Sequence, residues 1–132
     1  MSTDSTPTLT HPDAIALRAA ALAYPKTVED FPWGYPAFKV DGKKVFCFLS
    51  AREDGGFACS MKLPYRSEDA LRLPFAEPTG YGLGRSGWVS FTFTADDDVP
   101  AAELADWLDE SWRAVAPKTL SKSFPPPFET TR

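Results

Sequence analysis

Alternating apolar and polar residues mark the segments of this chain that are typical of half-buried strands. The alternation is clearest in residues 57–62 (FACSMK) and 88–94 (WVSFTFT), and residues 37–40 and 43–50 form two further apolar runs. Asp41-Gly42 separates those two runs, and this dipeptide favours a two-residue type I′ turn. The pattern therefore predicts a hairpin, a third strand and a later strand, with an extended partner segment inside residues 75–81.

Helical spacing replaces alternation in three other segments. Ile15, Ala19 and Leu22 form one stripe, which Leu17 and Tyr24 widen, between Pro12 and Pro25. A short helix is expected to start at Ser67 and end before Pro74. The last helix starts near Pro100, ends before Pro117 and has an apolar stripe along one face, formed by Leu104, Trp107, Leu108, Trp112 and Val115. The order of elements predicts an α+β two-layer sandwich, with helices on one face of an antiparallel sheet.

The length of 132 residues suits one domain. We expect a disordered N-terminal tail over residues 1–11, a single domain over 12–118 and a proline-rich C-terminal tail over 119–132. No apolar run approaches the length that crosses a bilayer, and the first residues do not resemble a secretory signal. The expected location is the cytoplasm, without membrane contact.

Few residues of this chain can carry catalysis. His11 is the single histidine, which argues against histidine-dependent triads and two-histidine zinc motifs. Cys47 and Cys59 lie inside apolar segments, so we expect buried free thiols rather than a metal site. The expectation is a protein that is not an enzyme and has no metal and no cofactor.

Charge is unevenly distributed along the sequence. The net charge is −4 and the pI is near 4.9, which is acidic for a nucleic-acid-binding protein. Residues 39–85 nevertheless hold eight bases and six acids, and residues 96–110 hold seven acids and no base. The chain is therefore expected to have a mildly basic side and a strongly acidic side.

The predicted hairpin places two lysines together. A two-residue Asp41-Gly42 turn would set Lys39 opposite Lys44 on the same side of the sheet. Like charges in that position repel, and an anion such as a phosphate would turn the repulsion into binding. Lys62, late on the third strand, would join them in a suitable register. The alternative is a solvated sheet face on which lysines oppose aggregation.

Two other patterns have a structural and a functional interpretation. Trp33 and Tyr35 lie in a proline-aromatic connector, where aromatic rings stack on nucleic-acid bases or pack over the end of a core. Residues 82–87 (GLGRSG) match a dinucleotide-binding spacing, but they precede a strand instead of a helix. A turn that needs positive φ accounts for these glycines.

The ordered motifs resemble one family over residues 15–118. They are EDFPWGYPAFKVDGKKVFCFLS, SMKLPY, GRSGWVSF and VPAAELADWLDESWRAVAPK, and together they resemble the MmcQ/YjbR proteins, small bacterial domains often described as DNA-binding. The resemblance implies the order α-β3-α-β2-α, akin to secretion-chaperone-like and frataxin-like folds. The positions that match its structural signature are Pro32, Trp33, Gly34, Pro36, Gly87 and Trp88.

Two functions follow as expectations. The first is a non-enzymatic binding module that takes DNA or another anion on a basic strand face. The resemblance adds Lys43 and Arg85 to that face, so the expected binding residues are Lys39, Lys43, Lys44, Lys62 and Arg85, with Trp33 and Tyr35 for stacking. The second is a protein-interaction or chaperone-like module, homodimeric in one version, that uses the open side or an edge of the sheet.

Overall fold

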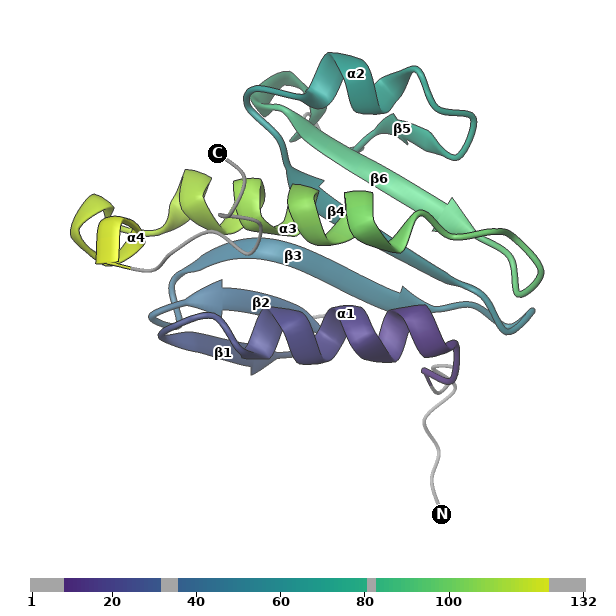
Figure 1. Cartoon of the computed structure of the whole chain (residues 1–132), viewed down its shortest axis with the longest axis horizontal. Helices are drawn as coiled ribbons and strands as arrows, with labels where there is room; N and C mark the ends of the chain where they lie inside the picture. Colours follow the sequence, from purple (N-terminus) through teal and green to yellow (C-terminus); the bar gives the residue numbers. More distant parts are fainter. Residues whose placement is uncertain (1–8, 32–35, 81–82, 124–132) are drawn as a thin grey trace.

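The computed structural model describes residues 9–31, 36–80 and 83–123, and Figure 1 shows their arrangement. The elements follow the order α1 (Pro12–Leu22), β1 (Thr27–Asp30), β2 (Ala37–Val40), β3 (Lys44–Ala51), β4 (Phe57–Lys62), α2 (Ser67–Leu71), β5 (Ala76–Pro78), the 3-10 helix η1 (Leu83–Ser86), β6 (Trp88–Phe93), α3 (Ala101–Val115) and α4 (Lys118–Ser123). No helix of these segments is both long and apolar enough to cross a bilayer.

All six strands form one antiparallel sheet in the order β1-β2-β3-β4-β6-β5. Helices α1 and α3 cover the same face of this sheet, and both run in the same direction (Figure 1). The predicted α+β fold with helices on one face is therefore confirmed. The sheet has one strand more than expected, because β1 pairs with β2 at the edge next to α1.

The core lies between this sheet and α3. In β4 and β6 every second residue belongs to the core, as the alternation predicts, and these residues meet the apolar stripe of α3. Phe91 stacks on Trp107 with ring centroids 4.8 Å apart. The ring centroids of Trp112 and Tyr24 lie 5.0 Å apart, and this contact brings the C-terminal ends of α1 and α3 together. Each large side chain buried here contributes about 1.5–3 kcal/mol.

Helix α1 does not use the predicted stripe to contact the core. Its buried residues are Ala14, Leu17, Ala21 and Tyr24, whereas Ile15 is 50% exposed and Leu22 is 37% exposed. The apolar residues of this alanine-rich helix surround most of its circumference, so spacing alone selects the wrong line of residues. Of the residues in the predicted stripe, only Leu17 and Tyr24, which were expected to widen it, face the core.

Residues just outside 12–118 also pack against the domain. His11, which the sequence assigns to the N-terminal tail, is 9% exposed, accepts a hydrogen bond from the Asp13 amide at 3.1 Å and packs on Phe57. The tail expected from residue 119 starts inside α4, where Leu120 packs against the core. Residues 1–8 and 124–132 lie outside the described part of the chain.

Both cysteines are free and buried, as predicted. Burial raises the pKa of the Cys59 thiol to about 12 and also raises the pKa of Cys47. Because the thiolate is the reactive form, we expect neither thiol of the native protein to react with a disulfide reagent at neutral pH. Both should react in denaturant, as absorbance of the released thiol would show. Rapid labelling of the native protein would contradict this prediction.

Candidate functional site

The turn between β2 and β3 forms as predicted, but the register beyond it differs. Asp41 and Gly42 have φ of 56° and 68°, and the Lys43 amide donates to the Val40 carbonyl at 3.0 Å, as in a type I′ turn. The strands then pair Val40 with Lys44, and Lys39 with Val45. The prediction that Lys39 lies opposite Lys44 is therefore wrong. Val40 is a core residue, so Lys44 lies on the helix side of the sheet and Lys39 on the other side.

A β-bulge shifts the β2–β3 register by one residue further along the hairpin. The ladder pairs Phe38 with Cys47 and shifts between Phe38 and Lys39, which leaves Phe46 as an extra residue on β3. The carbonyl of Phe46 accepts a hydrogen bond from the Ser111 hydroxyl of α3. The same hydroxyl accepts from the Lys62 amide at 2.7 Å, so one serine links the bulge to the end of β4.

Lys39 already has a partner within the sheet. Its ammonium group lies 2.8 Å from a carboxylate oxygen of Asp30 on β1. The hydrogen bond from Lys39, followed by one from the Phe31 amide, lowers the pKa of Asp30. Any anion that approached Lys39 would have to compete with this carboxylate. Lys39 is therefore the member of the expected set that is least available for binding.

The other four expected bases gather at one end of the sheet. Lys43 and Lys44 lie at the β2–β3 turn. Because β4 runs antiparallel to β3 and β6 antiparallel to β4, the last residue of β4, Lys62, and the segment just before β6, with Arg85, lie at that same end. These residues are expected on a strand face, whereas the structure brings them to an end of the sheet.

Three more lysines, which sequence reasoning missed, lie at this end. The Lys26 carbonyl accepts a hydrogen bond from the Asp41 amide at 2.8 Å, which fixes the α1–β1 turn beside the β2–β3 turn. Lys118 and Lys122 belong to α4, which Arg113 holds through a 2.8 Å bond to the Ser121 carbonyl. Lys26 and Lys118 each follow the C-terminus of a longer helix. That position is favourable for a base and is the sequence signal that would have found them.

We call these seven bases the basic end: Lys26, Lys43, Lys44, Lys62, Arg85, Lys118 and Lys122. None of them has an ion pair with another described residue. Every other described lysine or arginine has one, as the pairs Arg18–Glu29, Lys39–Asp30, Arg52–Asp54, Arg66–Glu110, Arg72–Asp69 and Arg113–Asp109 show. The bases without an internal partner thus lie along one end of the sheet, from Lys26 before β1 to Arg85 before β6.

The opposite end of the domain is acidic. We define the acidic end by Asp13, Glu53, Asp96, Asp97 and Asp98, in the first turn of α1, the β3–β4 turn and the β6–α3 loop. A Cβ on Gly55 would lie 3.2 Å from the Cβ of Ala95, so the last two segments are in contact. Since α1 and α3 both start at this end, their dipoles favour acids here and bases at the other end, by about 0.3–1 kcal/mol per charge.

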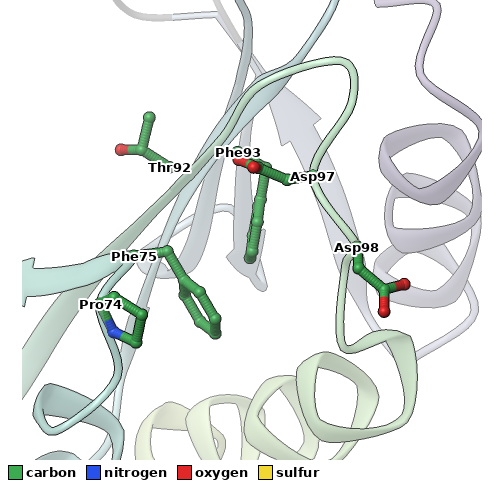
Figure 2. Close-up of a pocket in the computed structure, with 6 residues that line it drawn as sticks. All are labelled: Pro74, Phe75, Thr92, Phe93, Asp97 and Asp98. Atoms are coloured by element: carbon green, nitrogen blue, oxygen red, sulfur yellow. The ribbon is translucent and has the colours of Figure 1, made fainter.

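A pocket of about 320 Å³ opens beside the β6–α3 loop (Figure 2). The rings of Phe75 and Phe93 lie 4.8 Å apart in it, and Asp97 and Asp98 come from the loop. Asp97 accepts a hydrogen bond from the Thr94 amide at 2.7 Å, so its carboxylate stabilises the turn. The lining contains neither Lys62 nor Arg85, and the pocket is separate from the basic end.

The sheet face away from the helices is mixed in character. The Ser60 and Ser90 hydroxyls lie 2.8 Å apart, and Thr79 lies 2.9 Å from Ser90. Phe48 and Trp88 pack together there, with Trp88 only 8% exposed. Among the described residues of this face, the hydroxyl groups, the Phe48–Trp88 pair and the Lys39–Asp30 pair do not form the broad apolar surface that holding a partner segment would require.

The predicted stacking residues, the GLGRSG segment and the expected absence of a metal site remain to be compared with the structure. Trp33 and Tyr35, the stacking candidates, lie outside the described residues. Gly87 has φ of 88°, and a Cβ there would lie 3.1 Å from the Leu63 carbonyl oxygen. The last glycine of GLGRSG thus serves a turn before β6. Within residues 9–31, 36–80 and 83–123, no group of three or more histidine, cysteine or acidic side chains is arranged to hold a metal ion.

The fold can be compared with known proteins. The family model YjbR matches residues 22–114, and the chain therefore belongs to the YjbR family. A Deinococcus radiodurans protein with the domain DUF419 is similar in structure, with 26% identity, a TM-score of 0.66, and coverage of 88% of this chain and 91% of that one.

A second solved structure, of a Pseudomonas syringae protein, shares the fold with 18% identity and a TM-score of 0.57. That alignment covers 74% of this chain and 94% of the other. The comparison with curated proteins gave no match.

Proposed function

We propose that this YjbR protein is a non-enzymatic, cytoplasmic binding module that takes the phosphate backbone of a nucleic acid at its basic end. The observation that carries the proposal is the pairing pattern of the bases. Seven bases without an internal carboxylate lie at one end, whereas the other described bases have one. A base without a partner can contact a phosphate at no cost to the fold.

The acidic net charge of −4 is compatible with this role. The acidic end lies across the domain from the basic end, and ionic screening limits its effect over such a distance, because the Debye length is about 8 Å at physiological salt. The resulting polarity would orient the protein with the basic end toward a nucleic acid during approach. Phosphate contacts of this kind carry no sequence preference by themselves.

The test is binding of a fluorescently labelled DNA duplex, measured by anisotropy between about 50 and about 200 mM salt. The wild-type protein should bind more weakly as salt rises. The double variant Lys43→Gln/Lys44→Gln should bind more weakly at low salt, and its slope of log affinity against log salt should be smaller by about 2.

Lys39→Gln is the matched control, because it removes a lysine of the same hairpin that already pairs with Asp30. Its salt slope should equal that of the wild type. An equal loss in the control and the double variant would show that the basic end is not the contact surface. Absence of salt-dependent binding by the wild-type protein would overturn the proposal altogether.

A further inference from the structure

The outward face of α1 is apolar, which is unusual for a helix that faces water. Its exposed residues between positions 15 and 23 are Ile15, Ala16, Arg18, Ala19, Leu22 and Ala23. The one charged member, Arg18, is neutralised by Glu29 of β1 through two hydrogen bonds of 2.8 and 2.6 Å. This face therefore presents apolar side chains without a net charge.

The spacing of large and small residues on this face is symmetric about Ala19. If a second α1 lay antiparallel across the first with the two copies of Ala19 in contact, Ile15 of each copy would lie against Ala23 of the other. Leu22 would likewise lie against Ala16. Each large side chain would meet a small one, and the alanines would allow the helix axes to approach to about 8 Å.

Charges at the two ends of α1 complete the match. Asp13 lies in the first turn, and Lys26 follows the C-terminal end. The two are separated from Ala19 by nearly the same number of residues. In the antiparallel arrangement Asp13 of one copy would lie beside Lys26 of the other, twice in each dimer. The acidic end of each copy would also lie near the basic end of its neighbour, and the two helix dipoles would oppose each other favourably.

We propose that α1 is a self-association surface, on which a second copy of this chain docks its own α1 in antiparallel orientation. A twofold axis through Ala19 makes such an interface self-complementary and closes it at two copies. Because α1 has only 11 residues, the interface is small and the dimer is weak. Lys26 is the one base of the basic end that the interface itself contains, and the dimer forms without a nucleic acid, so this inference does not depend on nucleic-acid binding.

Sedimentation equilibrium of the protein alone, without nucleic acid, tests the proposal. We expect the wild type to change from monomer to dimer between about 10 µM and about 1 mM. Ala19→Lys should keep it monomeric over this range, because two ammonium groups would meet at the twofold axis. Ala114→Lys makes the same change at an exposed alanine of α3 and should leave the dimer intact. Circular dichroism verifies that both variants are folded.

A charge exchange tests the antiparallel orientation. Asp13→Lys alone and Lys26→Asp alone should each weaken self-association at least tenfold, because each places like charges together at both ends of the interface. An equimolar mixture of the two variants should recover heterodimers of wild-type affinity. A wild type that stays monomeric at about 1 mM, dimerisation of Ala19→Lys at the wild-type concentration, or no recovery in the mixture would overturn the proposal.

Discussion

Replacing Gly56 with alanine is expected to destabilise the protein by about 3 kcal/mol or more. A Cβ at this position would lie 1.9 Å from the Phe93 carbonyl oxygen and 2.7 Å from the Thr94 Cα, so it would meet backbone that cannot rotate away. Gly56 is also held in place, since its amide donates to Asp54 at 2.9 Å and its carbonyl accepts from Arg52 at 3.0 Å. The turn would have to separate from β6.

Gly80→Ala is the matched control for this prediction. Apart from its chain neighbours, no atom of residues 9–31, 36–80 and 83–123 lies within 4 Å of a Cβ at Gly80, so its effect should stay within about 0.5 kcal/mol. Denaturant unfolding followed by tryptophan fluorescence gives both values. Similar midpoints for the two variants would mean that the β3–β4 turn can move away from β6 at little cost.

Local sequence patterns predict those parts of this fold in which one face of an element is buried. Alternation in residues 57–62 and 88–94 predicted strands that the structure shows as β4 (57–62) and β6 (88–93), and the 3.6-residue stripe of α3 faces the core as expected. The same logic fails for α1, where alanines make several faces equally apolar. It also misses β1, whose four residues TVED include two acids and are ordered by pairing with β2 and by the Arg18–Glu29 contact.

The basic end could not be predicted from the sequence, because its residues come from distant parts of the chain. Lys26, Lys62 and Lys118 are far apart in the chain, and only the antiparallel strand order together with the parallel direction of α1 and α3 brings their ends together. The predicted Lys39–Lys44 pair fails because three residues, 41–43, separate the paired Val40 and Lys44, so that the two lysines lie on opposite faces. Further along the hairpin the register shifts again at the bulge residue Phe46, whose carbonyl is held by a serine of α3.

Replacing that serine, Ser111, with alanine is the second substitution expected to destabilise the protein strongly. The β3–β4 ladder ends at the pair Cys47–Met61, and the next position has the Ser111 hydroxyl between the Phe46 carbonyl and the Lys62 amide. Ser111 is fully buried. Ser111→Ala leaves both backbone groups without their partner, and each such group costs about 1–3 kcal/mol. We therefore expect a destabilisation of about 2–4 kcal/mol.

Ser60→Ala separates this effect from the loss of any serine hydroxyl. Ser60 bonds Ser90 on the half-exposed sheet face, where water can replace the lost group, so its removal should cost less than about 1 kcal/mol. Hydrogen exchange adds a local measurement. The Lys62 amide should exchange faster in Ser111→Ala, relative to neighbouring amides of β4, and stay protected in Ser60→Ala. Unchanged protection of Lys62 in Ser111→Ala would mean that β3 and β4 close onto each other without the serine, and that the bulge does not depend on α3.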